Sequence, residues 1–174
     1  SGGTSDGSFF EFERISELLQ GKNPVRELWD RLSSIPGGRT IFSKAVGIMA
    51  PYTGTIRPRV AELREGFCRV EMDDRRRVRN HLNSIHAMAL TNLSEVSSGL
   101  AVVYSLPDRM RGILTGFEID YLKKARGTLS AEADVVLPEL GEEDTEFEVP
   151  VTTRDPEGDV VTRATARWRV GSTS

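Results

Sequence analysis

The apolar positions of the N-terminal part of the chain have the spacing of helices. Between Val25 and Leu32 they recur every three or four residues, with Asn23 as a candidate N-cap and "PGG" as a stop signal. A second helical pattern, "TIFSKAVGIMA", ends where "PYTGT" breaks the chain. The sequence therefore predicts an N-terminal helical segment over residues 23–50.

The apolar period falls to two in six later segments, which predicts strands. "TIRPRVAELREGFCRVEMD" reads as two strands that turn at Glu65 and Gly66, and Pro58 places the first near an edge or a strand start. Four more strands are expected from "GILTGFEIDYL" onward, and "RDPEGD" has the residues of a hairpin turn between the last two.

A long apolar stretch, "HAMALTNLSEVSSGLAVVYS", separates the first two strands from the last four. It is apolar on nearly every side and rich in Ala, Ser and Gly, which is typical of a buried helix that other elements approach closely. The predicted fold class is α+β: an antiparallel sheet of about six strands wrapped around a long central helix.

Composition narrows the remaining choices. A chain of 174 residues with 38% hydrophobic content suits one domain, expected over residues 23–174, after a disordered tail or expression scar over residues 1–22. The net charge of −3 gives no indication of nucleic-acid binding. One cysteine, Cys68, excludes an internal disulfide and fits the cytoplasm, and no apolar run reaches the ~20 residues of a membrane span.

Candidate chemistry gathers around the central helix. Asn80 is followed six residues later by His86, and nine residues after that by Glu95. A glutamate on an apolar helix usually reaches solvent or pairs with an arginine. Nine helical residues would place Glu95 about 13 Å along the axis from His86 and on the opposite side, so the two would share a site only if the helix pairs with its copy across a two-fold axis.

The segments "NHLNSIHAMALTNLSE" and "GFEIDYLKKARGTLSAEADV" resemble the hotdog-fold acyl-CoA thioesterases of the phenylacetate-pathway type, and are most similar to their uncharacterised-domain branch. The resemblance covers roughly residues 50–170, and Asn80, His86 and Glu95 match the family's spacing. The sequence departs from the family in having His-Ala-Met where His-Gly-Gly is usual, and in having Glu where many members have Asp. The resemblance implies two equivalent sites at a homodimer interface, with a dimer of dimers as a further possibility.

The family resemblance implies a role for each of these residues. Backbone amides of Ala87 or Met88, at the positive end of the helix, would hold the oxyanion of a thioester. Glu95 of the other chain would act as general base or nucleophile. Asn80 would orient water or the thioester, and His86 would shape the loop through a hydrogen bond.

Two basic clusters are candidates for the phosphates of coenzyme A, which is expected as part of the substrate and not as a cofactor. Lys123, Lys124 and Arg126 end a strand where the family often binds nucleotide phosphates. The arginines of "DDRRRVRN", residues 73–80, are the alternative, although a solvated loop is the simpler explanation for them.

Three functions remain open at this point. Hydrolysis of an acyl-CoA thioester is favoured by Asn80, His86 and Glu95. A non-catalytic module that binds acyl groups or acyl-CoA is favoured by the His-Ala-Met opening, and by the absence of a Ser or Thr where the family places one, near Leu114 or Thr115. A hotdog dehydratase needs a different arrangement of His and carboxylate.

Overall fold

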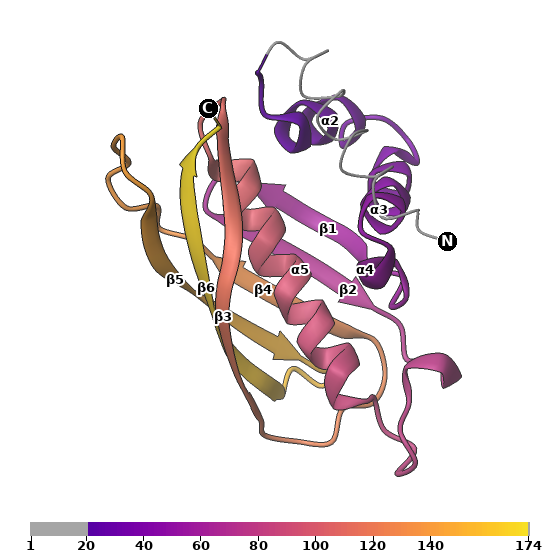
Figure 1. The fold of residues 1–174 in the computed structure, drawn as a ribbon. Helices are drawn as coiled ribbons and strands as arrows, with labels where there is room; N and C mark the ends of the chain where they lie inside the picture. The colour runs from indigo at the N-terminus through magenta and orange to yellow at the C-terminus, as the bar shows by residue number, and fades with distance from the viewer. Residues whose placement is uncertain (1–20, 174) are drawn as a thin grey trace, which may run out of the picture.

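The computed structural model of the protein describes residues 21–173. The tail expected over residues 1–22 therefore lies outside the described residues, apart from Gly21 and Lys22. Figure 1 shows a curved sheet that wraps one long helix, with shorter helices beside one edge.

The predicted N-terminal helices are present and are followed by a short third one: α2 (Pro24–Leu32), α3 (Gly38–Met49) and α4 (Pro51–Gly54). Asn23 caps α2 as expected, since its Oδ1 accepts the Arg26 N–H at 3.1 Å. Its Nδ2 donates to the carbonyl oxygens of Val103 and Leu106, at 2.6 and 3.0 Å. One asparagine thus begins α2 and binds it to the end of the central helix.

The strand predictions are confirmed. Six strands form one antiparallel sheet in the order β1-β2-β4-β5-β6-β3. Their bounds are β1 (Arg59–Arg64), β2 (Phe67–Met72), β3 (Met110–Tyr121), β4 (Leu129–Asp134), β5 (Thr145–Arg154) and β6 (Val160–Ser172). Pro58 precedes β1, which lies at one edge, and "RDPEGD" turns the chain between β5 and β6.

The central helix α5 (Ala87–Ser105) packs against the concave face of the sheet (Figure 1). Leu93, Ala101 and Val102 on α5 have no exposed surface, and neither do Val70, Leu129 and Val149 on three strands. Burial at this level contributes about 1.5–3 kcal/mol for each large aliphatic side chain. The predicted α+β class, with a sheet of six strands around a buried helix, is confirmed.

The two edges of the sheet differ. At β1, the Val60 N–H donates to Ser43 Oγ at 2.8 Å, and the Ala61 carbonyl accepts from Arg39 Nη1 at 2.9 Å. Both partners lie on α3, so this helix occupies hydrogen-bonding groups that another strand would need. At the other edge, β3 pairs with β6 on one side, and no strand of residues 21–173 covers its second side.

Across residues 21–173, none of the helices is long and apolar enough to cross a membrane.

Candidate functional site at the start of the central helix

His86 forms the entrance to α5. Its backbone is extended (φ −63°, ψ 140°), and its Nδ1 accepts the Met88 N–H at 3.0 Å. The His86 N–H donates to the Val78 carbonyl at 2.7 Å, which holds the preceding loop against the helix. His86 is therefore the N-cap of α5, directly before the first helical residue.

This cap divides the two expected oxyanion donors. The Met88 N–H is already bonded to the His86 ring. The Ala87 N–H, by contrast, has no hydrogen-bond partner in residues 21–173, and it points out of the positive end of a 19-residue helix. Ala87 is thus the donor that remains free for an anionic ligand atom.

Asn80 organises the loop before the helix. Its Oδ1 accepts the N–H groups of Leu82 (3.0 Å) and Ser84 (3.3 Å) and also lies 3.2 Å from the Ser84 hydroxyl. The Asn80 N–H donates to the Ser84 carbonyl at 2.8 Å. The amide oxygen is therefore occupied by local turn contacts, whereas Nδ2 makes no hydrogen bond within the described residues and remains a donor.

Asp74 fastens this loop to the connection between β3 and β4. Its carboxylate accepts from Arg79 Nε at 2.6 Å and from the Gly127 N–H at 2.9 Å. Partial burial alone would raise the pKa of Asp74, but these two bonds and the nearby charge of Arg126 outweigh it and lower the pKa. Arg79 also donates to Asn83 at 3.0 Å, so the loop has several polar anchors.

Glu95 lies about one helical turn beyond Thr91 and two turns beyond Ala87, on the side of α5 that faces β3 and β6. A Cβ atom on Gly99 would lie 3.2 Å from the Trp168 ring and 3.9 Å from Glu95 Oε1, which places the carboxylate beside that glycine. Burial raises the pKa of Glu95, and no neighbouring charge or hydrogen bond offsets the effect. A half-buried carboxylate without a partner in residues 21–173 has the properties of a general base.

Glu95 and Ala87 of one chain are too far apart to act on one carbonyl group. Eight residues at about 1.5 Å each separate them by about 12 Å along the helix axis. A site that uses both needs a second copy of the chain.

Tyr121 and Thr91 complete the surroundings of the helix start, and the sequence analysis missed both. The Tyr121 hydroxyl, at the end of β3, lies 2.7 Å from the Thr91 hydroxyl and 3.3 Å from the Ala87 carbonyl oxygen. The Thr91 hydroxyl also donates to that carbonyl at 3.0 Å. The available signal was the i+4 spacing of Thr91 from Ala87, but the contact with β3 depends on strand register.

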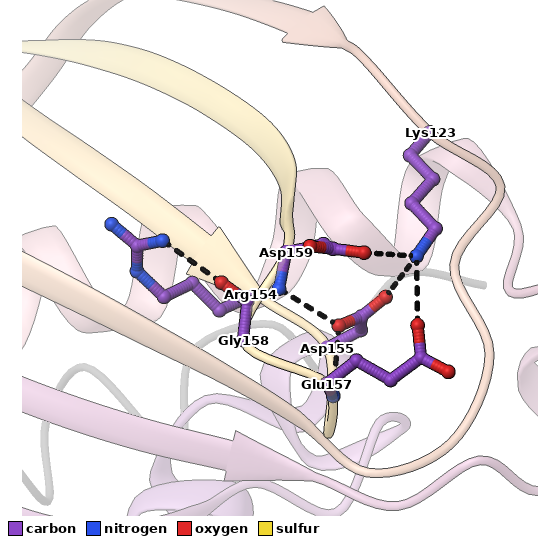
Figure 2. Close-up of polar contacts among 6 residues, drawn as sticks. All are labelled: Lys123, Arg154, Asp155, Glu157, Gly158 and Asp159. Carbon is purple, nitrogen blue, oxygen red and sulfur yellow. Dashed lines mark hydrogen bonds and ion pairs between the residues drawn. The ribbon is translucent and has the colours of Figure 1, made fainter.

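Lys123 occupies a different environment from the one expected. Figure 2 shows its ammonium group facing the carboxylates of Asp155, Glu157 and Asp159 in the β5–β6 turn. Lys123 Nζ lies 2.7 Å from both Asp155 Oδ2 and Asp159 Oδ2 and 3.4 Å from Glu157 Oε2. The hydrogen bond that Lys123 donates to Asp155 is the largest of the contacts that raise the pKa of Lys123. The three carboxylates are grouped closely enough for a cation, and Lys123 supplies that charge, so it is poorly suited to a phosphate.

Lys124 and Arg126 keep the expected character. Both are exposed, and neither forms an ion pair in the part of the chain that the structure describes. Arg126 Nε donates to the Asn83 carbonyl at 3.3 Å, so its guanidinium lies beside the loop that leads to α5. Of the predicted phosphate-binding cluster, these two residues are the ones available.

A cavity within residues 21–173 lies away from the start of α5. It has a volume of about 990 Å³ and is bounded by α3, α4 and the first two strands. Of the residues predicted for the site, Arg75, from the alternative phosphate-binding cluster over residues 73–80, is the one that lines it. The start of α5 is a stronger candidate for the active site than this cavity, because it has the free Ala87 N–H. A pocket that two chains form together would not be visible in a single chain.

Comparison with known proteins identifies the family. A family model described as a domain of unknown function, DUF4442, matches residues 38–170. The chain belongs to the DUF4442 family. No curated protein matches it. The DUF4442 match begins at α3 and therefore leaves α2 outside.

Solved structures extend the comparison. The structural genomics protein APC5556 is 30% identical, with a TM-score of 0.73 over 85% of this chain and 98% of that one. A Pseudomonas aeruginosa protein described as a probable thioesterase is 20% identical (TM-score 0.65; 79% and 97% covered). A thioesterase from Haemophilus influenzae is 15% identical (0.63; 70% and 83%). These matches confirm a hotdog fold like that of thioesterases; the phenylacetate-pathway type stays a prediction.

Proposed function

We propose that this DUF4442 protein hydrolyses an acyl thioester, with acyl-CoA as the expected form, at sites formed between two copies of the chain. The observation that carries the proposal is the pair formed by Glu95, a half-buried carboxylate without a partner in the described residues, and the free Ala87 N–H. The thioesterase descriptions of fold relatives support the same reaction class.

The open edge of β3 supports a dimer. The strand is 12 residues long, and Ile113, Tyr121 and the adjacent Leu122 expose 44–54% of their surface. Long exposed edges tend to pair with another chain, and α3 already blocks the opposite edge of the sheet. Antiparallel pairing of two β3 strands across a two-fold axis would bring Glu95 of one protomer toward the start of the partner's α5.

The chemistry then divides between the chains. Glu95 removes a proton from water as the water oxygen bonds to the thioester carbon, and the Ala87 N–H and the helix dipole stabilise the resulting oxyanion. When this tetrahedral intermediate collapses, the carbon–sulfur bond breaks and the thiolate takes the proton from Glu95. The products are a carboxylic acid and a free thiol. Asn80 Nδ2 would hold the water or the carbonyl in place.

Glu95 has a second route, direct attack that forms a mixed anhydride. After a single turnover in H₂¹⁸O, label found in the Glu95 carboxylate would establish direct attack. Direct attack leaves ¹⁸O in the Glu95 carboxylate whenever water attacks the enzyme carbonyl of the anhydride, whereas general-base catalysis places the label only in the released acid.

A non-catalytic acyl-binding module is the second candidate, and one observation favours it. The cap from His86 removes the Met88 amide from the oxyanion site, so that of the two expected oxyanion donors the Ala87 N–H alone is free within residues 21–173. Free-thiol release measured over a panel of acyl-CoA esters decides between the two. Hydrolysis that Glu95→Gln abolishes supports the enzyme, and binding of acyl-CoA without thiol release supports the module.

A further inference from the structure

A cavity of about 990 Å³ between α3, α4 and the edge of the sheet is separate from the start of α5 (Figure 1 shows the elements that bound it). Five of its lining residues are basic and two are acidic. Arg59 already pairs with both acids, at 3.3 Å from Glu71 and 2.6 Å from Asp73. The remaining basic side chains include Lys44, Arg57 and Arg75, so the cavity carries an excess of positive charge.

Arg75 has a guanidinium group that is only partly hydrogen-bonded. Its Nε is buried and makes no hydrogen bond in residues 21–173, whereas its Nη2 donates to the Thr55 carbonyl at 3.2 Å. Burial and the neighbouring charge of Arg57 lower the pKa of Arg75, and the opposing effect of Asp73 is smaller. A buried guanidinium nitrogen in a positive environment is stabilised by an anion.

Arg57 adds a second, independent observation. Its φ is +50°, a backbone region that residues other than glycine rarely adopt. Strain of this kind persists where the surrounding structure enforces it and is often found at ligand sites. Here it places an arginine, in place of the favoured glycine, on the wall of a basic cavity.

The part of the wall where the end of α3 meets α4 carries no charged side chain. Gly47, Ile48, Pro51 and Gly54 line the cavity, and a Cβ atom on Gly54 would lie 2.5 Å from the Gly47 carbonyl oxygen. This close approach holds α4 across α3. Ile48 is 77% exposed, so it offers apolar surface to a ligand in this cavity.

We propose that this cavity binds an amphiphilic anion, with a carboxylate or phosphate head against Arg57 and Arg75 and an apolar body along Ile48 and Pro51. Guanidinium groups bind both head groups through paired hydrogen bonds, and the apolar wall adds affinity that a small inorganic anion cannot gain. The site is distinct from the proposed thioesterase site, so Glu95→Gln is expected to bind the same ligand unchanged.

Calorimetric titration of the full chain tests the proposal with octanoate, octyl phosphate, octanol and inorganic phosphate. One octanoate or octyl phosphate should bind per chain, and the relative affinity of these two probes identifies the preferred head group. Octanol and inorganic phosphate should bind at least tenfold more weakly, because each lacks half of the recognised chemistry. Equal affinity for octanol and both octyl anions would overturn the proposal.

Variants place the ligand. Arg75→Gln and Arg57→Gln should each weaken binding about tenfold, whereas Arg77→Gln, a nearby exposed arginine that does not line the cavity, should leave it unchanged. If Arg75→Gln lowers the melting temperature, Arg57→Gln and Lys44→Gln, both of exposed residues, provide the decisive comparison. A photoreactive diazirine analogue of octanoate should label peptides within residues 39–61. Equal affinities for Arg57→Gln and Arg77→Gln, or labelling confined to residues 86–122, would contradict the assignment.

Discussion

The Tyr121 hydroxyl lies 2.7 Å from the Thr91 hydroxyl, and both lie within 3.3 Å of the Ala87 carbonyl oxygen. The first turn of α5 is thereby joined to the end of the open edge strand. We expect Tyr121→Phe and Thr91→Val to be coupled by about 0.5 kcal/mol in a double-mutant cycle of urea unfolding, since the hydrogen bond is partly exposed. Tyr52→Phe is a matched control on an exposed tyrosine. Additive effects would mean that the contact contributes nothing to stability.

Glu95 should make stability depend on pH in an unusual direction. Burial raises the pKa of Glu95 in the folded protein above that of the unfolded chain, so the stability present below the unfolded value of about 4.3 is lost as pH rises through the folded value. Glu95→Gln should therefore be more stable than wild type at pH 8, and the advantage should disappear near pH 4. Thermal unfolding at both pH values measures it. A constant difference would show that the carboxylate is well solvated.

Asp74 is predicted to hold the Asn80 loop in place. Asp74→Asn weakens the bonds from Arg79 and Gly127, so the melting temperature should fall by about 3 °C or more, and thioester turnover should fall with it. The lowered pKa of Asp74 implies that its stabilisation is present above the unfolded value of about 3.9 and lost as pH falls through the folded value. Asp120→Asn, on the exposed face of β3, is the control and should have neither effect.

Of the basic residues after β3, Lys124 and Arg126 should affect substrate binding, whereas Lys123 should affect stability. Lys124→Glu and Arg126→Glu should raise KM for acyl-CoA several-fold more than KM for a short acyl thioester without the nucleotide, because they would contact phosphates far from the reacting carbon. Lys123→Gln should change stability more than KM, since its charge is already held by the β5–β6 turn. Equal effects of Lys124→Glu on both substrates would remove Lys124 from the substrate site.

Most of the fold follows from local pattern. The period of two, the turn residues at Glu65 and Gly66, and the Asn23 cap were each sufficient to predict the element that the structure contains. The small residues of α5 also predicted its burial, because Gly99 admits the Trp168 ring at a distance that a side chain would obstruct.

The candidate site was less predictable because its contacts join distant segments. His86 was expected to shape the loop, but its capping of Met88 depends on an extended backbone that spacing does not reveal. Lys123 looked equivalent to Lys124 in sequence. The three carboxylates that distinguish it come from a turn more than 30 residues away, and the register of β3 on β6 brings the two segments together.

The account depends most on a site shared between two chains, and mixed dimers test this directly. Glu95→Gln removes the base, and Asn80→Asp keeps the acceptor oxygen of the loop while removing the Nδ2 donor. The homodimer of each variant should lose hydrolytic activity, and for Glu95→Gln the rate should fall by about 100-fold. After subunit exchange, confirmed by a tagged pull-down, half of the dimers are mixed and each has one intact site of two.

The measurement is thiol release from acyl-CoA by the exchanged mixture. The account predicts recovery to about a quarter of wild-type activity, because Asn80 of one protomer then meets Glu95 of its partner in one site. Activity that stays at the level of the separate variants, despite confirmed exchange, would contradict a shared site and leave Glu95 as a charged residue on a packed helix.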